Sequence, residues 1–280
     1  MFKKVGLVSR ADRKSALQLA TKIMGHLENK GLDVILDPKL AKRINKSESA
    51  VPLDRMKADL IITIGGDGTI LRTCLELPKP EPPILAINMG MRGFLAEIYP
   101  REALEAVEKT VQGKYRLEST MKLASFLGDT RLPDALNEVS VTSVAPAKIL
   151  YMRLWKDNTI VAECQSDGAV IATQVGSTGY SLSAGGPVID PDVRAFVFTP
   201  IAPLTVFHPI VFSTDSTVNV ELLKPKFATI VIDGRYQVKA TPKNSKITVT
   251  KSENESSFVR FKEDFYHRLK ARLLFSRGRP

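Results

Sequence analysis

The first hundred residues alternate between short apolar runs and segments whose apolar residues recur three or four positions apart. Lys4–Ser9 and Leu32–Asp37 are short, mainly apolar runs, which predict strands. The segment between them predicts an amphipathic helix, with Asp12 in position to cap its start and Gly31 its end. Its predicted apolar face comprises Ala16, Ala20, Ile23, Met24 and Leu27. A strand–helix–strand unit of this kind indicates a parallel sheet with helices on its faces.

The same alternation continues to residue 113. Residues 59–64 (DLIITI) and 84–88 (ILAIN) predict two further buried strands, and a helix is expected to start near Thr69. A last helix is predicted over residues 100–113, because it opens with proline and closes with glycine. We therefore expect residues 1–113 to form an α/β domain with a parallel sheet.

The pattern changes beyond Tyr115. Most segments up to Thr250 are short, rich in β-branched residues and separated by turn residues, and helical periodicity is nearly absent. The predicted strands include residues 137–143, 148–155, 168–173, 217–223, 228–233 and 246–250. Residues 114–252 are therefore expected to form an all-β domain, either a sandwich or a layered sheet. Helical spacing returns in residues 257–275, so residues 253–280 are predicted to be a helical tail that packs back on the first domain.

Composition narrows the class of protein. The 280 residues are 44% hydrophobic, which suffices for one large domain or two ordinary ones. No apolar run is long enough to span a bilayer and the start lacks the apolar core of a signal peptide, so we expect a cytoplasmic protein without a membrane partner. The net charge of +10 suits polyanions, which include nucleic acid, nucleotides, polyphosphate and an anionic membrane, although most of the lysines are expected simply to form a solvated surface. No nucleic-acid-binding motif occurs, so no nucleic acid partner is expected.

The few cysteines and histidines predict no metal-binding cluster. Cys74 and Cys164 are far apart in the sequence, and the three histidines are scattered without metal-ligand spacing. Two reduced, buried thiols are the expected state of these cysteines.

The most informative segment, Gly65-Gly66-Asp67-Gly68-Thr69, follows the strand at residues 59–64. The carboxyl end of a strand is where parallel sheets bind ligands, and glycines before a helix start suit phosphate. The segment fits neither the P-loop nor the GxGxxG pattern. A carboxylate repels phosphate unless a cation or a proton acceptor is needed, and phosphoryl transfer uses both. The alternative is an acidic turn in which Asp67 only caps the helix.

The pentapeptide GGDGT after an apolar strand resembles the signature of a kinase superfamily that includes the NAD kinases and the diacylglycerol and sphingosine lipid kinases. Later segments resemble the NAD kinase family and occur in that family's order. These segments are NMGMRGFL (88–95), LNE (136–138), SDGAVIATQVGSTGYSLSAGGPVIDP (166–191), TPIAPLTV (199–206) and IDGRYQV (232–238). The resemblance covers most of residues 60–240 and implies the same architecture, α/β first and all-β second.

The resemblance also implies a role for each matching residue. Asp67 matches the acid proposed to accept the proton of the 2′-hydroxyl on the adenosine ribose of NAD. Arg72, one turn further, is placed to pair with a phosphate. The loop that faces the phosphates matches at Gly65, Gly66, Gly68 and Thr69. Contacts to NAD are implied for Gly68, Arg72, Phe94, Asn137, Glu138, Lys148, Asp167, Thr178, Gly179, Tyr180, Ser181, Leu182 and Ser183.

Several of these residues also have an ordinary structural explanation. Phe94 is an apolar residue suited to a core, Asn137-Glu138 is suited to a turn before a strand, and Asp167-Gly168 is a hairpin signal. The segment GSTGYSLSAGG is less easily explained in this way, because its small and hydroxyl side chains bury little area; a ligand-binding loop fits them better.

The sequence departs from the family pattern at several positions. These are Gln165 in place of an arginine of some members, Gln174, Val175 and Gly179 in place of Pro, Thr and Ala, Leu204 in place of His, and Arg235 in place of Gln. Loss of the proline predicts a looser loop.

The sequence therefore predicts an NAD kinase that makes NADP from NAD and either ATP or polyphosphate. The nucleotide is expected between the domains, and Mg²⁺ or another divalent metal is expected on the phosphates rather than in a protein metal site. The family suggests a homodimer or homotetramer. Two alternatives stay open: a lipid kinase of the diacylglycerol or sphingosine type, which needs an apolar slot, and a non-catalytic nucleotide-binding regulator.

Overall fold

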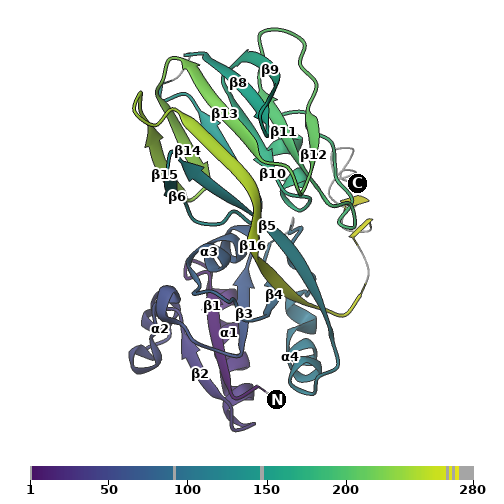
Figure 1. Ribbon diagram of the computed structural model, residues 1–280. Helices are drawn as coiled ribbons and strands as arrows, with labels where there is room; N and C mark the ends of the chain where they lie inside the picture. The colour runs from purple at the N-terminus through teal and green to yellow at the C-terminus, as the bar shows by residue number, and fades with distance from the viewer. Residues whose placement is uncertain (1, 91–92, 146–147, 263–264, 267–268, 271–280) are drawn as a thin grey trace, which may run out of the picture. The chain divides into compact units, whose positions relative to one another are not determined.

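The computed structural model describes residues 2–90, 93–145, 148–262, 265–266 and 269–270. The chain divides into two compact units, drawn in Figure 1. The N-terminal unit contains Met1–Ser119 together with the end of the chain from Ser256, and the C-terminal unit contains Thr120–Glu255.

A parallel sheet forms the centre of the N-terminal unit. Its strands have the order β2–β1–β3–β4, and each neighbouring pair is parallel. Their bounds are Lys4–Ser9 for β1, Asp33–Leu36 for β2, Leu60–Gly65 for β3 and Ile84–Asn88 for β4. Ser9 pairs with Ile64 and Gly65 with Asn88, so the carboxyl ends of β1, β3 and β4 lie at one edge of the sheet. The predicted α/β fold of the first domain is confirmed.

Helix α1 (Lys14–Glu28) covers the sheet through the apolar face that its sequence predicts. All five residues of that face are buried, and they share one core with Val5 and Leu7 of β1. Helix α4 (Ala103–Val111) lies beside α1, with 3.0 Å between the Glu108 Oε2 and His26 Nε2 atoms. The apolar side chains of α1, spaced at the helical period, therefore pack against those of β1 in a single apolar layer.

The C-terminal end of α1 is as predicted, but its N-terminal end is not. Gly31 has a φ of 75°, and its N–H donates to the carbonyl of Glu28, as expected for a glycine after a helix. At the start, the N-cap residue is Arg13 and no side chain caps the helix. The prediction that Asp12 caps α1 is wrong, because its carboxylate instead accepts a charged hydrogen bond of 2.8 Å from Arg10 Nε.

The other helical elements of this unit are short. They are α2 (Pro38–Arg43), α3 (Asp67–Glu76) and the 3-10 helices η1 (Ser47–Ser49), η2 (Leu53–Arg55) and η3 (Pro100–Glu102). α3 follows β3 directly and contacts it, so the GGDGT segment is the connection between a central strand and its helix.

The C-terminal unit consists mainly of antiparallel strands. One sheet has the order β12–β11–β10–β7–β14–β15, and all of its neighbouring pairs are antiparallel. The bounds are Glu138–Thr142 for β7, Gly168–Ala172 for β10, Ala195–Ile201 for β11, Ile210–Ser213 for β12, Ala228–Ile232 for β14 and Tyr236–Ala240 for β15. Helical structure interrupts this unit at η4 (Gly176–Thr178) and α5 (Tyr180–Ser183).

Further antiparallel strands have the order β16–β13–β8–β9. Their bounds are Lys246–Arg260 for β16, Val218–Lys224 for β13, Leu150–Lys156 for β8 and Thr159–Ser166 for β9. β5 (Arg116–Leu127) pairs with β6 (Thr130–Arg131). The predicted mostly β second domain is confirmed.

β16 corrects the prediction for the end of the chain. A helical tail was expected from residue 253, but the strand continues to Arg260. Phe258, Val259 and Arg260 are all buried, and a strand that is buried on both faces loses the alternation that identifies strands in a sequence. The predicted return to the first domain does occur, because Phe258 pairs with Ile84 of β4. Phe265 and Tyr266 are helical, and much of the remaining predicted tail lies outside the described residues.

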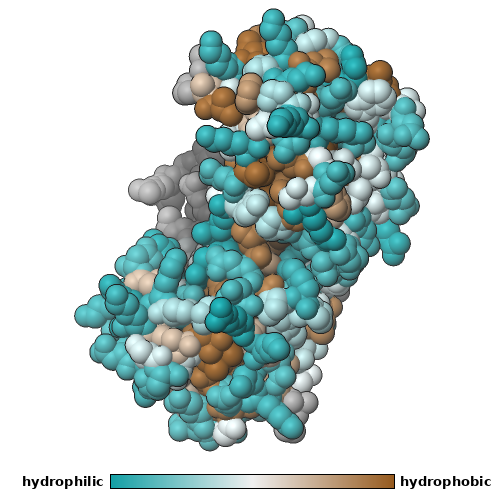
Figure 2. Space-filling view, turned by 60° about the vertical axis from the view of Figure 1, so that its left-hand side comes forward, coloured by the Kyte–Doolittle hydropathy of each residue, from teal (hydrophilic) through white to brown (hydrophobic). Residues whose placement is uncertain are grey.

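The surface gives no sign of a membrane-spanning helix. Among the described residues, no helix is both long enough and apolar enough to cross a bilayer. Figure 2 shows hydrophilic side chains over most of one face of the molecule. Exposed apolar residues such as Leu204 and Val206 follow β11, and single residues of this kind are common on protein surfaces.

Candidate active site

The GGDGT segment forms a tight turn from β3 into α3. Gly65 ends the strand, Gly66 is the N-cap residue, and Asp67 is the first residue of the helix. A Cβ atom on Gly65 would lie 2.1 Å from Thr69 Oγ1, so the turn leaves no space for a side chain there. A Cβ atom on Gly66 would meet nothing within 4 Å, and its φ of −99° suits any residue. Packing therefore explains Gly65 but not Gly66.

The Asp67 carboxylate is bound by backbone amides from the segment after β4. Oδ2 accepts a hydrogen bond of 2.9 Å from the N–H of Phe94, and Oδ1 accepts one of 3.2 Å from the N–H of Leu95. Asp67 is the first residue of α3, after the N-cap residue Gly66, and that it has more than a structural role in the turn stays a prediction. The two N–H donors and the helix start favour the ionised carboxylate, which is the form that can accept a proton.

Arg72 is paired within the protein. Its Nη2 atom lies 3.0 Å from Asp37 Oδ2 and its Nη1 atom 3.3 Å from Asp37 Oδ1, and the two side chains are only 12% and 4% exposed. Asp37 is the residue between β2 and α2, which the sequence did not single out. That Arg72 contacts a phosphate stays a prediction, and the structure adds a buried partner that orients its guanidinium.

Phe94 contributes to this region through its backbone. Its N–H holds Asp67, whereas its ring is buried and lies edge-on to Phe265, with 5.3 Å between ring centroids. The ring contact is of the ordinary core type. That Phe94 lies beside an adenine stays a prediction.

In the C-terminal unit, the Asn137–Glu138 pair packs against the loop that contains Gly176 and Gly179. A Cβ atom on Gly176 would lie 2.0 Å from the carbonyl oxygen of Asn137. A Cβ atom on Gly179 would lie 3.1 Å from Glu138 Oε2 and 3.5 Å from Asn137 Nδ2. The structure therefore brings together two predicted parts of the site, which lie about forty residues apart in the sequence, and glycine permits the close approach.

Two side-chain oxygens of this pair are buried and have no hydrogen-bond donor among the residues that the structure describes. They are Asn137 Oδ1 and Glu138 Oε2. Buried acceptors of this kind are costly, and proteins satisfy them with protein groups, water or a ligand. The two oxygens are thus suited to a ligand that offers O–H or N–H donors, such as a ribose or a base.

The Glu138 carboxyl has an unusual acidity. Burial first, and then the charge of Asp233, raise its pKa to about 7, while a hydrogen bond from the backbone N–H of Tyr180 acts in the opposite direction. Near neutral pH, a modest change in environment therefore changes the charge of Glu138.

We expect the stability of the unliganded C-terminal unit to fall as the pH rises from about 4.5 to 7. In this window the folded chain keeps the Glu138 proton and the unfolded chain releases it, so folding is penalised above the window by on the order of 3 kcal/mol. Glu138→Gln should reduce this slope, and the part that persists is due to other buried carboxyls such as Asp233, whereas Glu255→Gln, at an exposed position in β16, should leave it unchanged. Urea unfolding at pH 4.5 and 8, followed by the fluorescence of the single tryptophan, Trp155 in β8, measures both. Equal slopes in wild type and Glu138→Gln would contradict the assignment.

Most hydroxyl groups of the 173–183 loop are used inside the protein. Thr178 Oγ1 donates to the carbonyl of Val175 at 2.9 Å, and Ser181 Oγ lies 2.8 Å from Thr199 Oγ1. Gln174, which replaces the family's proline, donates from Nε2 to the carbonyl of Val193 at 2.7 Å. Loss of the proline predicted a looser loop, whereas this hydrogen bond holds the loop against the segment before β11. That the loop's hydroxyls contact a nucleotide stays a prediction, while Ser183 is exposed and Leu182 half-buried.

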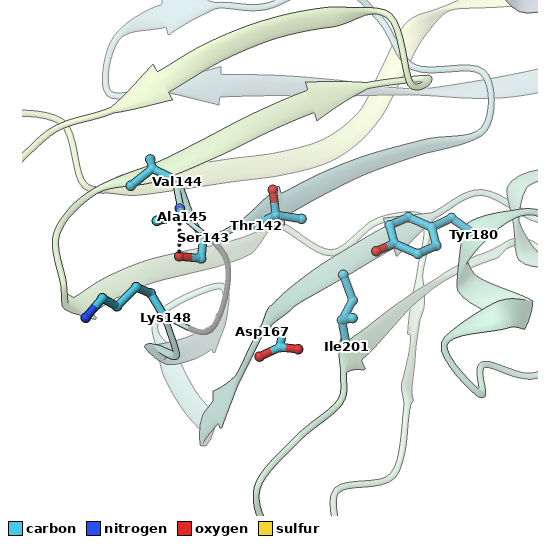
Figure 3. Close-up of a pocket in the computed structure, with 8 residues that line it drawn as sticks. All are labelled: Thr142, Ser143, Val144, Ala145, Lys148, Asp167, Tyr180 and Ile201. Carbon is cyan, nitrogen blue, oxygen red and sulfur yellow. Dashed lines mark hydrogen bonds between the residues drawn. The ribbon is translucent and has the colours of Figure 1, made fainter.

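A pocket of about 370 Å³ lies beside this loop, and Figure 3 shows it. Its lining contains three of the predicted residues, Lys148, Asp167 and Tyr180, with the Asp167 carboxylate drawn between the Lys148 ammonium group and the Tyr180 ring. The sequence did not single out the other lining residues, which are Thr142, Ser143, Val144, Ala145 and Ile201. They follow or end the strands β7 and β11, and small residues at strand ends carry little signal of their own. The volume is of the size that holds part of a nucleotide.

The described residues contain no group of three or more His, Cys, Asp or Glu side chains that could hold a metal ion. Asp67, half-buried at the start of α3, offers a carboxylate next to the glycine loop. That a divalent metal is carried by the phosphates of a substrate, as is common for Mg²⁺, stays a prediction.

Taken together, the GGDGT turn between β3 and α3 and the β-rich second unit indicate a class of protein, the two-domain phosphotransferases. Family models give the particular family. Residues 5–115 match the ATP-NAD kinase N-terminal domain, and residues 136–261 match the ATP-NAD kinase C-terminal domain. The chain therefore belongs to the NAD kinase family, and it is a kinase.

Full-length relatives agree with the family models. The chain is 40% identical to the NAD kinase of Methanothermobacter thermautotrophicus over 97% of its own length and 96% of that protein. It is 38% identical to the NAD kinase of Thermococcus sibiricus over 94% and 96% of the two chains. These matches favour the NAD kinases over the lipid kinases that share the GGDGT signature.

Solved structures show the same fold. An NAD kinase from Archaeoglobus fulgidus, crystallised in complex with ATP, matches with a TM-score of 0.79 and 30% identity over 96% of this chain and 99% of that one. Yeast NADH kinase, crystallised with NADH, matches with a TM-score of 0.88 over 99% and 89% of the two chains. At 23% identity, the yeast enzyme supports the fold alone.

Proposed function

We propose that this enzyme phosphorylates the 2′-hydroxyl of the adenosine ribose of NAD, with Asp67 as the proton acceptor. The observation that carries the proposal is the Asp67 carboxylate, which backbone amides of Phe94 and Leu95 hold at the carboxyl end of β3 within a glycine turn. A fixed carboxylate beside an open stretch of backbone suits the meeting of a hydroxyl and a phosphate.

The C-terminal unit would supply the contacts to NAD. The unpaired acceptors on Asn137 and Glu138 suit hydroxyl or amino donors of a nucleoside. Lys148, Asp167 and Tyr180 line a pocket of suitable size for a further part of the dinucleotide. The loop residues Thr178, Gly179, Ser181, Leu182 and Ser183 belong to the same proposed binding region.

ATP is the donor we favour, since the Archaeoglobus fulgidus enzyme was crystallised with ATP. The phosphates would lie along Gly65, Gly66, Gly68 and Thr69, where a ligand can approach the backbone closely. Arg72 would help to neutralise their charge, and a divalent metal on the phosphates would neutralise a further part of it.

The reaction then needs one proton transfer. The 2′-oxygen of NAD attacks the terminal phosphorus of ATP, so an O–P bond forms and the bond between that phosphorus and the bridging oxygen breaks. Asp67 takes the proton from the 2′-hydroxyl as the oxygen attacks, and ADP leaves with the bridging oxygen. The products are NADP, ADP and a proton.

The test is an assay of NADP formation. Purified protein is incubated with NAD, Mg²⁺ and either ATP or inorganic polyphosphate, and NADP is measured with an NADP-specific dehydrogenase. We expect NADP with ATP, and turnover with polyphosphate would add a second donor. NADH offered in place of NAD, with NADPH as the measured product, gives the preference for the redox state. Binding of NAD without turnover with either donor would overturn the proposal and favour a nucleotide-binding regulator.

We further propose that the enzyme acts in the cytoplasm as a homodimer or homotetramer, as the family suggests. Size-exclusion chromatography with light scattering measures the assembly: a mass of two or four times 30.8 kDa supports the proposal and a monomer contradicts it.

A further inference from the structure

Asp233 lies in the turn between β14 and β15, and its side chain is buried beneath the Asn137–Glu138 pair. Oδ1 accepts hydrogen bonds from the N–H groups of Asn137 at 2.8 Å and of Glu138 at 3.0 Å. Oδ2 accepts one of 2.8 Å from the N–H of Leu136. The N–H of Asp233 in turn donates to the carbonyl of Glu138 at 3.0 Å. A single residue therefore fixes the backbone of the whole pair.

Burial leaves the pKa of Asp233 raised, but its hydrogen-bond partners suit a carboxylate. The side chain is 3% exposed, and all three of its hydrogen-bond partners are donors. Burial raises the pKa of Asp233, whereas the three N–H groups and the charge of Lys122, a fully buried lysine of β5, lower it. A carboxylate that accepts three N–H bonds is held in its ionised form more firmly than burial alone would allow.

The backbone conformation of Asp233 adds a second constraint. Its φ is 49°, a left-handed value that asparagine, aspartate and glycine adopt most readily. Gly234 follows with a φ of 66°, so the two residues form the type of turn that joins neighbouring strands of a hairpin. A turn of this kind forms without a buried carboxylate. The hairpin alone therefore does not explain the three hydrogen bonds that Asp233 accepts from residues 136–138.

We propose that Asp233 is a positioning residue for nucleotide binding, which presents the unpaired oxygens of Asn137 and Glu138 to the substrate. The proposal rests on the proposed role of that pair in binding NAD. Asp233 itself does not touch the substrate in this scheme; it acts through the backbone it holds. Its negative charge also acts on Glu138, whose carboxyl is faced by Asp233 and by the N–H of Tyr180, while Lys122 acts on Asp233 itself.

Asp157 offers a matched control within the same unit. It lies in the turn between β8 and β9 with a φ of 53°, its Oδ1 accepts a hydrogen bond of 3.0 Å from the N–H of Thr217, and its own N–H donates to the carbonyl of Thr217 at 2.7 Å. Asp157 and Thr217 thus form the same two hydrogen bonds as Asp233 and Glu138, but on strands that contain no predicted site residue. Asp157→Asn therefore reports the structural cost of losing such a bond alone.

The experiment compares Asp233→Asn with Asp157→Asn and wild type. Asparagine keeps the left-handed backbone but places an amide nitrogen against a backbone N–H, so residues 136–138 lose one of their bonds. We expect the Kd for NAD, measured by calorimetry, and the KM for NAD to rise at least about tenfold in Asp233→Asn. Asp157→Asn should leave both within about twofold of wild type. Unfolding followed by Trp155 fluorescence reports any loss of stability in each variant.

A second readout separates positioning from a merely structural role. The charge of Asp233 raises the pKa of Glu138, so its removal should shift the acid limb of the pH profile of NAD binding to lower pH. Unchanged NAD affinity and an unchanged pH profile in a folded Asp233→Asn protein would overturn the inference. The calorimetric Kd can be measured without turnover. If the wild-type protein binds NAD but makes no NADP, the proposed reaction is contradicted, whereas the role of Asp233 in binding can still be tested.

Wild-type protein provides a measurement that does not depend on the folding of a variant. If Asp233 holds residues 136–138 before the substrate arrives, their amide hydrogens should exchange slowly in the absence of NAD, as slowly as those in the middle of β7. Fast exchange of these amides without NAD would contradict the inference.

Discussion

Asp67→Asn should lower kcat for NADP formation by about 10²–10⁴ while leaving the Kd for NAD nearly unchanged. The amide keeps the size of the carboxylate and can still accept from the N–H of Phe94 or Leu95, but it cannot accept a proton at neutral pH. The loss therefore falls on the chemical step. Single-turnover kinetics at saturating NAD and ATP measure it directly, since they separate chemistry from binding and product release.

Asp59 is the matched control for Asp67. It precedes β3, whereas Asp67 follows it, and Asp59 Oδ2 accepts backbone hydrogen bonds from Lys3 at 2.7 Å and Lys4 at 2.9 Å. Asp59→Asn removes a carboxylate with the same kind of partners from the other end of the strand, so it should cost some stability and no more than about twofold in kcat. If the two variants lose activity to the same extent, Asp67 is a structural residue and another group accepts the proton.

The two glycines at the end of β3 should respond to alanine in opposite ways. Gly65→Ala places a Cβ atom 2.1 Å from Thr69 Oγ1 and 2.7 Å from its Cβ, so the first turn of α3 must shift. We expect a loss of about 1–3 kcal/mol in the free energy of unfolding, which is typical of overpacking. Gly66→Ala meets nothing within 4 Å and has an allowed φ, so its stability should change by less than about 1 kcal/mol.

The functional effect of Gly66→Ala should nevertheless be large. If phosphates of the donor approach the backbone here, the added methyl group displaces them, and a shift of about 1 Å can cost about 10²-fold in rate. Thermal unfolding followed by circular dichroism and kcat/KM for ATP give the two quantities. A stable Gly66→Ala enzyme with wild-type kcat/KM for ATP would mean that the phosphates lie elsewhere, because nothing in the protein itself requires glycine at this position.

Local sequence patterns were sufficient to predict most elements of the N-terminal unit. The bounds of β1 and the buried face of α1 agree with the expectation because each pattern reflects one element packed on one core. The pattern failed at Phe258–Arg260, where burial on both faces removes the alternation of a strand. It also failed at Asp12, because a local cap and a neighbouring arginine compete for the same carboxylate and the arginine prevails.

The candidate site was predictable where a motif is contiguous and not where it depends on distant partners. Asp67 and the Asn137–Glu138 pair stand in recognisable segments. Asp233 also lies in a matched segment, IDGRYQV, but that segment indicates no partner for its side chain: its bonds are to residues nearly one hundred positions earlier, and an Asp-Gly dipeptide predicts only a hairpin turn. Likewise, nothing in the sequence around Arg72 indicates Asp37 as its partner, because that contact is made only when β2 and β3 are arranged on either side of β1.

The course of β16 bears on how the protein is made. A ribosome synthesises the chain from its N-terminus, yet the N-terminal unit includes Phe258, which pairs with β4, and Arg260, which donates to the carbonyl of Leu95 at 2.8 Å and to Glu118 at 3.0 Å. The nascent chain therefore holds β4 without this partner strand until residues 258–260 leave the exit tunnel. The first unit to be translated is thus completed only after the whole of the second unit has been made, so a stop codon before Phe258 removes part of the N-terminal unit.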